Sequence, residues 1–192
     1  DYAYHLLRIE SIARNIEDGY FSSRIHNMAL NGYGYGSGLF YPDLFLYFPA
    51  VLRVLGLRME YAYGLFVMVI SLLTGLSMYY SCRHISKSRY AGLCAMAMYV
   101  LCQYRLHNLY TRMAVGEYLA FIFAPLVICG LYNLFYEGFD NPFWLILGFW
   151  GLMYTHTISL AIFGILAVIA SLCHIKVFVK NPRLLLKVLL AA

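Results

Sequence analysis

The sequence predicts an all-α protein, namely a polytopic transmembrane helical bundle preceded by interfacial (juxtamembrane) helices at its N-terminus. Two observations predict this fold class. Hydrophobic residues make up 62% of the 192 positions and charged residues only 12%, and the hydrophobic residues form several uncharged runs of near-membrane length. A soluble domain carries about 25% charged residues, so this chain has roughly half the charge needed to cover a water-facing surface. Lipid is therefore the predicted solvent.

The first 60 residues are predicted to form an outer-face loop with amphipathic and interfacial helices. Residues Tyr4 to Asp18 carry apolar side chains at helical spacing, with Arg8 among the charged residues of the polar face, and Gly19 ends the helix. The stretch from Leu39 to Gly56 is apolar but contains two prolines, an aspartate and an arginine. We predict a helix lying along the outer interface there, and the alternative is an ordinary span.

Residues 61–192 are predicted to form the transmembrane helical bundle. A span needs about 20 helical residues, and a polar interruption at 154–157 divides the longest uncharged run in two. The predicted spans are 61–81, 90–104, 113–136, 142–154 and 158–173, with the start of another at 184–192. Because the sequence opens on Asp1 without an initiator Met and stops inside an apolar run, we expect a fragment of a longer protein.

The basic residues predict the orientation of these spans. Lysine and arginine gather in 82–89 and 174–187, whereas 113–173 contains none, and such clusters mark the cytoplasmic side. An even number of crossings then separates the two clusters. The same topology places residues 1–60, the link 105–112 and the hairpin at His156 together on the outer face.

Other features argue against several kinds of partner or site. The formal net charge is +5, but the basic residues form no stripe interleaved with aromatic residues, so we expect no nucleic-acid partner. The five cysteines lie mostly in apolar runs without CxxC spacing and are predicted to be packing residues. The sequence has no HExxH motif and no Ser-His-Asp order typical of metalloproteases or serine hydrolases.

Three places carry ionisable groups that could perform chemistry. Asp1, Tyr4, His5 and Arg8 recur at spacings of three and four and form one polar cluster on a helix; the alternative is an N-cap aspartate followed by solvated residues.

Glu117 is the only charge in 113–136, and an ionisable group within a span usually faces a polar cavity or a partner. Arg112 could supply the opposite charge, either in a functional site or in a structural ion pair. His156 interrupts an apolar run. It is either a ligand or hydrogen-bond donor for an anionic group, or a turn histidine without a role.

Two ordered blocks of sequence resemble a known family. The first block is Asp1-x-x-Tyr4-His5-x-x-Arg8-Ile9, Gly19-Tyr20-Phe21-x-x-Arg24-Ile25 and Gly32-Tyr33-Gly34-Tyr35-Gly36-x-Gly38-Leu39-Phe40-Tyr41-Pro42, and the second runs from Leu109 through Arg112, Gly116 and Glu117 to Leu126. They resemble the outer segments of GT-C glycosyltransferases, closest to the bacterial branch labelled 6-pyruvoyl-tetrahydropterin synthase-related membrane domains. Asp43 departs from the pattern, because such loops often have proline there.

The resemblance implies a multi-pass enzyme of the bacterial cytoplasmic (inner) membrane whose active face points outward. It would transfer a sugar from a polyprenyl-phosphate-linked donor, held among membrane lipids, to an acceptor. The implied catalytic residues are Asp1, as base or metal ligand, and Glu117, and both are candidates for a possible divalent metal. The implied substrate-binding residues are His5, Arg8, Arg112, His156, Tyr35 and Tyr41.

Two other function classes fit the same sequence. A non-catalytic transporter or membrane-assembly protein for a lipid or polysaccharide could use the same outer cavity. A purely structural subunit predicts instead that Asp1, Arg112 and Glu117 do not converge. If the site exists, Asp1, His5, Arg112, Glu117 and His156 should line one cavity.

Overall fold

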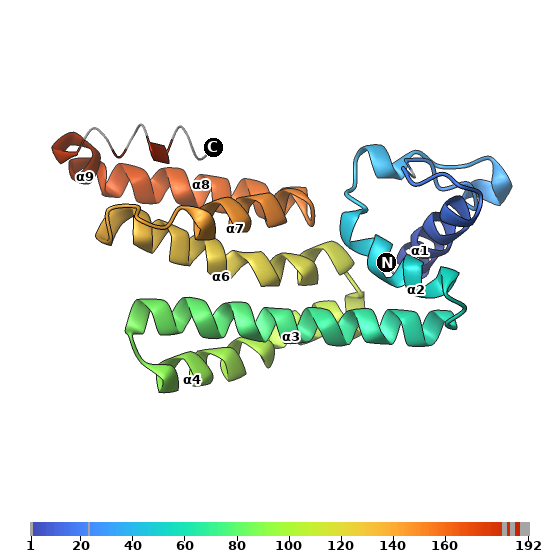
Figure 1. The fold of residues 1–192 in the computed structure, drawn as a ribbon, viewed down its shortest axis with the longest axis horizontal. Helices are drawn as coiled ribbons and strands as arrows, with labels where there is room; N and C mark the ends of the chain where they lie inside the picture. Colours follow the sequence, from blue (N-terminus) through green and yellow to red (C-terminus); the bar gives the residue numbers. More distant parts are fainter. Residues whose placement is uncertain (1, 23, 182–183, 185–186, 189–192) are drawn as a thin grey trace.

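The computed structural model describes residues 2–22, 24–181, 184 and 187–188. Within them it is all-helical, as the sequence predicts, and its only β pairing is an isolated antiparallel bridge between His26 and Tyr35. Figure 1 shows an N-terminal lobe beside one end of a layer of long helices. The lobe consists of α1 (Tyr2–Glu17), the 3₁₀ turns η1 (Leu30–Gly32), η2 (Ser37–Leu39) and η3 (Leu44–Leu46), and α2 (Tyr47–Val54).

Helix α1 matches the helix predicted over 4–18. It ends at the predicted glycine, because Gly19 takes a left-handed φ of +85° and the next amide, that of Tyr20, bonds back to the Asn15 carbonyl at 2.7 Å. Of the predicted polar face, Arg14 and Glu17 are exposed, whereas Arg8 is buried. His5, Arg8, Ser11 and Asn15 are all buried, since side chains of the following loop cover them.

The predicted interfacial helix over 39–56 is broken into η2, η3 and α2. Helix α2 has 8 residues and rises about 12 Å, which is too short for the ordinary span that was the alternative. It packs on α1, and Arg53 Nε donates to Glu10 Oε2 at 2.9 Å between them.

The rest of the described chain forms the helical layer of Figure 1, in which α6 packs between α3 and α7 and also contacts α8. The elements are α3 (Met59–Ser86), α4 (Arg89–Val100), α5 (Gln103–His107), the π-helical turn η4 (Asn108–Arg112), α6 (Val115–Tyr136), α7 (Phe143–Met153), α8 (Thr157–Cys173) and α9 (Ile175–Lys180).

Two of the described helices, α3 and α6, are long and apolar enough to cross a membrane. They have 28 and 22 residues, and their most apolar segments have mean hydropathies of 1.7 and 1.9. The other predicted spans correspond to α4, α7 and α8 with 12, 11 and 17 residues, each shorter than the roughly 20 residues that a perpendicular crossing needs. The predicted span at 184–192 lies largely outside the described residues.

Helix α4 stops four residues before the end of the predicted run 90–104 because a buried arginine caps it. Arg105 is 1% exposed, and its guanidinium donates to the Val100 carbonyl at 3.0 Å and to Ser71 Oγ of α3 at 2.9 Å. Basic side chains satisfy the free carbonyls of a helix C-terminus in this way. The bonds also fix the end of α4 to α3.

Glycines allow α6 and α7 to approach closely. A Cβ added at Gly130 would lie 2.6 Å from backbone atoms of Leu145, and one added at Gly148 would lie 2.8 Å from the Val127 backbone nitrogen. Small residues bring helix backbones together in this manner where the hydrophobic effect between helices is weak.

The end of the helical layer farthest from the lobe carries an ion-pair cluster. Glu137, just after α6, accepts hydrogen bonds from His84 Nε2 at 2.7 Å, Asn133 Nδ2 at 2.8 Å and Lys87 Nζ at 3.0 Å. These bonds, with that of His84 as the largest cause, lower the pKa of Glu137 to about 2. The basic link between α3 and α4 and the basic helix α9 both lie at this end (Figure 1).

Candidate functional site

A cluster of polar side chains surrounds Glu117 in the first turn of α6. Glu117 Oε2 accepts hydrogen bonds from Tyr104 Oη at 2.7 Å and Asn108 Nδ2 at 2.9 Å, and Arg112 Nη2 donates to Oε1 at 3.0 Å. Arg112 also donates to Asn108 Oδ1 at 3.0 Å. We call these four residues the Glu117 cluster.

The local backbone explains how the cluster forms. Tyr104, Asn108 and Arg112 recur every four residues along α5 and η4, so they share one face of this helical segment. The left-handed residue Met113, with φ of +52°, then turns the chain into α6 and directs Glu117 back toward that face. The helix N-terminus favours a carboxylate at this position.

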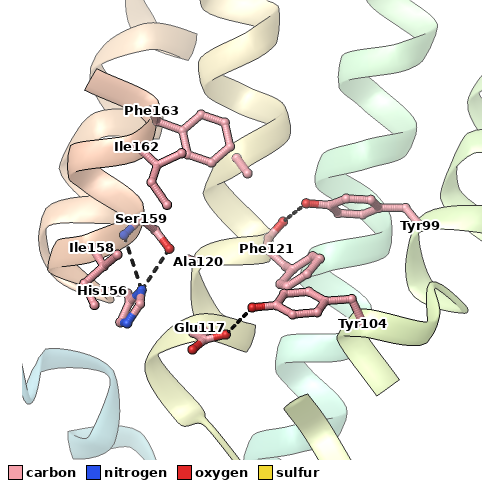
Figure 2. Close-up of a pocket in the computed structure, with 11 residues that line it drawn as sticks. Tyr99, Tyr104, Glu117, Ala120, Phe121, His156, Ile158, Ser159, Ile162 and Phe163 are labelled. Atoms are coloured by element: carbon pink, nitrogen blue, oxygen red, sulfur yellow. Dashed lines mark hydrogen bonds between the residues drawn. The ribbon is translucent and has the colours of Figure 1, made fainter. Parts of the chain in front are cut away.

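An apolar cavity of about 310 Å³ opens beside Glu117, between α4, α6 and α8 (Figure 2). Glu117, Tyr104 and His156 provide its polar end. Apolar side chains provide most of the remaining wall: Ala120, Phe121, Ala124, Ile158, Ile162 and Phe163. A cavity of this kind suits a ligand that is polar at one end and apolar along its length.

His156 presents one ring nitrogen as a donor. Its Nδ1 caps α8 by accepting from the Ser159 amide at 3.3 Å and lies 2.9 Å from Ser159 Oγ. Burial lowers the pKa of His156 below its usual value; the nearby Glu117 carboxylate opposes this shift and the Arg112 charge adds to it. The ring is therefore neutral at pH 7, and because Nδ1 accepts, Nε2 carries the proton.

A second cluster lies in the N-terminal lobe around Arg8, which is 1% exposed. Its Nε donates to Asp43 Oδ1 at 2.9 Å, and Nη2 donates to the same oxygen and to the Pro42 carbonyl. His26 Nε2 lies 3.3 Å from Asp43 Oδ2. Asp43 thus neutralises Arg8. We call Arg8, His5, His26, Tyr41 and Asp43 the Arg8 cluster.

His5 completes the Arg8 cluster as a neutral side chain. Its Nδ1 lies 3.3 Å from Arg8 Nη1 and accepts from it. Burial, followed by the Arg8 charge, lowers the pKa of His5 to about 3.

Tyr41 joins the two clusters. The Arg8 guanidinium carbon lies 4.5 Å from the centroid of its ring. A Cβ added at Gly116, next to Glu117, would lie 2.2 Å from Tyr41 Oη and 2.9 Å from the Thr155 carbonyl oxygen. Only glycine at 116 allows the lobe, the start of α6 and the turn before His156 to meet.

The structure divides the described site residues between the cavity at Glu117 and the Arg8 cluster, and does not bring them all into one cavity. Glu117 and His156 line one cavity, Arg112 bonds to Glu117, and His5, Arg8 and Tyr41 belong to the adjoining Arg8 cluster. Tyr35 is 51% exposed, and its link to the Arg8 cluster is the backbone bridge to His26. Asp1 lies outside the described residues.

Sequence reasoning missed four polar members of these clusters: Asn108, Tyr104, His26 and Asp43. The every-fourth-residue spacing of Tyr104, Asn108 and Arg112 is a signal that could have identified the first two. No comparable signal identifies the others, because 35 positions separate Arg8 from Asp43.

The described residues do not form a metal site. No group of three histidine, cysteine or acidic side chains is arranged around a common point within that part of the chain. Both oxygens of Glu117 accept hydrogen bonds already. Glu117 therefore acts as a hydrogen-bond acceptor.

Comparisons with known proteins show a distant similarity. An uncharacterized protein of Lactococcus lactis subsp. cremoris (strain MG1363) is 24% identical over 164 residues, which cover 83% of this chain. No family model matches the chain, and no solved structure matches it significantly. The match covers 27% of the relative, so this chain corresponds to about a quarter of that protein.

Proposed function

We propose that the chain is the membrane-embedded part of a GT-C-like glycosyltransferase of the bacterial cytoplasmic membrane. It would transfer a sugar from a polyprenyl-phosphate-linked donor to an acceptor at the outer face. The observation that carries the proposal is the single polar end of the apolar cavity, where Glu117, Tyr104 and His156 meet. A polyprenyl phosphate has the matching form, with a charged head on an apolar chain.

The proposal places the shorter helices in the membrane as well. Helix α8 contains no buried residue, and outside the cavity wall it exposes apolar side chains at Ile165, Val168, Ile169 and Leu172. Such a surface is rare on soluble monomers and is stable in contact with lipid. We therefore infer that α4, α7 and α8 are embedded beside α3 and α6, and that the end carrying the basic clusters faces the cytoplasm.

The described residues suggest how the leaving phosphate would be stabilised. The Arg112 side chain is 43% exposed and supplies positive charge, and the neutral His156 can donate from Nε2. Glu117 orients Arg112 with two hydrogen bonds and is a positioning residue. The acceptor hydroxyl also needs a base, a role that the family resemblance assigns to Asp1.

Full-length protein in proteoliposomes tests this function. Mass spectrometry would follow the transfer of sugar from a panel of undecaprenyl-phosphate-linked hexoses to cell-envelope glycan acceptors. We expect Glu117→Gln to slow transfer about 100-fold or more, because Arg112 loses its orienting charge.

Glu137→Gln is the matched control, since Glu137 is also held by cationic partners but lies at the other end of α6. Equal effects of the two substitutions, or no transfer from any donor by the unsubstituted protein, would refute the proposal.

One observation favours a second candidate, a protein that holds the lipid without reacting with it. Glu117 already accepts from three side chains, so it has little capacity left as a base. In that case the same proteoliposomes would bind the donor in an Arg112-dependent manner without transferring its sugar. A purely structural subunit predicts that Asp1, Arg112 and Glu117 do not converge; Arg112 and Glu117 meet, and Asp1 lies outside the described residues.

A further inference from the structure

A second, polar groove lies in the N-terminal lobe, between the later part of α1 and the loop around η1. Its volume is about 380 Å³. None of its lining residues belongs to the Glu117 cluster or the Arg8 cluster. The lining residues are Ser11, Arg14, Asn15, Asp18, Asn27, Met28, Asn31 and Gly32.

Hydrogen bonds fix the walls of this groove. Asn27 Nδ2 donates to Asn15 Oδ1 at 2.9 Å, and Asn15 Nδ2 donates to the Ile25 carbonyl at 3.2 Å. Asn31 adopts a left-handed conformation, with φ of 56° and ψ of 34°, which turns the loop over the groove. In the same wall, the buried hydroxyl of Ser11 has no hydrogen-bond partner among the described residues.

The chemistry of the walls selects the kind of ligand. Three carboxamides can each donate and accept, and Arg14 and Asp18 contribute opposite charges. The Asp18 carboxylate offsets the attraction of Arg14 for a phosphate, and an apolar ligand would leave the polar groups desolvated without partners. A sugar hydroxyl, which donates and accepts at once, matches this lining.

Two exposed aromatic residues neighbour the lining residues, one along the chain and one through a backbone hydrogen bond. Tyr33 follows the lining residue Gly32 and is 91% exposed, and Tyr20 is 69% exposed with its amide bonded to the Asn15 carbonyl at 2.7 Å. Aromatic rings combine an apolar face with a polar group, which suits the apolar and hydroxylated faces of a pyranose ring.

We propose that this groove is a binding site for a neutral carbohydrate. Arg14, Asp18 and the carboxamides contact hydroxyl groups, and Tyr33 stacks on a sugar ring. The proposal concerns binding only, so it stands or falls separately from the sugar transfer proposed for the cavity at Glu117.

Saturation-transfer NMR on the full-length protein in nanodiscs tests the groove. The probes are neutral tetrasaccharides of glucose, galactose, mannose and N-acetylglucosamine, with inorganic phosphate as the charged comparison. We expect at least one tetrasaccharide to bind without competition from phosphate. Asp18→Asn and Tyr33→Ala should each weaken that binding about tenfold, the loss expected for one charged hydrogen bond or one stacked ring.

Two control variants make the outcome specific. Tyr90→Ala removes a tyrosine that is 75% exposed at the far end of the helical layer, and Glu117→Gln alters the other site; both should leave saccharide binding unchanged. The proposal is overturned if no tetrasaccharide binds, if phosphate displaces it, or if Asp18→Asn and Tyr33→Ala bind as the unsubstituted protein does.

Discussion

At the scale of residues, the N-terminal lobe depends on a buried ion pair. The Arg8 and Asp43 side chains are 1% and 7% exposed. Removing two charges from water costs several kcal/mol, and good geometry with additional hydrogen bonds must offset that cost. The Pro42 carbonyl provides such a bond at 2.9 Å, and the Tyr41 ring covers the guanidinium. The pair therefore holds α1 against the loop that precedes α2.

Asp43→Asn should destabilise the protein by roughly 3–5 kcal/mol, because it leaves the Arg8 charge buried without its counter-ion. Thermal and denaturant unfolding of the detergent-solubilised protein measures the change. The control is Glu60→Gln, which removes a carboxylate that lies 3.5 Å from Arg58 in an exposed pair and should cost less than about 1 kcal/mol. Similar losses in the two variants would contradict a buried, charge-dependent role for Asp43.

His5 should make stability depend on pH. Because its pKa is about 3 in the folded protein and about 6.5 when unfolded, the unfolded state binds more protons between these values. The contribution of the neutral His5 ring to the free energy of unfolding is fully present above pH 6.5. It is lost as pH falls toward 3, with a slope of at most about 1.4 kcal/mol per pH unit. Carboxylates with lowered pKa values contribute in the same direction, so the unsubstituted protein alone does not isolate His5.

A comparison with His5→Gln isolates the histidine. The free energies of unfolding of the two proteins should converge as pH is lowered from 7 to 4, because only the unsubstituted protein loses the contribution of this ring. Parallel curves over that range would show that the His5 pKa is not lowered.

At the scale of elements, the contact between α6 and α7 depends on glycine. Helix α7 has only 11 residues, so its position is set by packing on α6 rather than by its own helical stability. Backbone atoms of Leu145 lie where a side chain at Gly130 would have to go. The two helices could not keep their present separation with any other residue at 130.

Gly130→Ala should lower stability by about 1–3 kcal/mol, because α7 must move away from α6. Gly164→Ala is the matched control: this glycine lies within α8, and an added Cβ would meet nothing within 4 Å. The control should be neutral or slightly stabilising, since alanine has the higher helix propensity. Unfolding in detergent measures both, and an equal response would show that the close approach is not needed.

At the scale of the whole molecule, the two ends of the helical layer differ in charge and in chemistry. The Glu117 cluster and the N-terminal lobe lie at one end, and Glu137 with the basic links lies at the other (Figure 1). Helix α6 joins the ends with 22 residues, a rise of about 33 Å that matches the hydrocarbon thickness of about 30 Å.

Cysteine labelling in intact cells tests this polarity. In a full-length variant without native cysteines, Thr111→Cys should react with a membrane-impermeant maleimide added outside, because it lies in the link before α6. Asp140→Cys, after α6, should react only once the membrane is permeabilised. The reverse pattern would exclude an outward-facing site, and labelling of both positions from one side would exclude α6 as a membrane crossing.

Much of the helical framework could be predicted from the sequence. The ranges of α1, α3, α6 and α8 lie close to the predicted ones, because apolar periodicity and long uncharged runs are local signals. The end of α4 could not be predicted, since the bond from Arg105 to the Val100 carbonyl depends on how the chain turns afterwards. The break of 39–56 into turns and a short helix was missed for a similar reason.

The sequence by itself determined that the protein is helical and apolar, that its basic residues are segregated, and that Glu117, Arg112 and His156 are exceptional in apolar surroundings. Only the tertiary structure decided which of these groups meet. Arg8 turned out to be buried against Asp43, whereas Glu117 and His156 share a cavity. The physical reason is that composition and periodicity depend on neighbouring residues, whereas burial of a charge depends on partners tens of residues away.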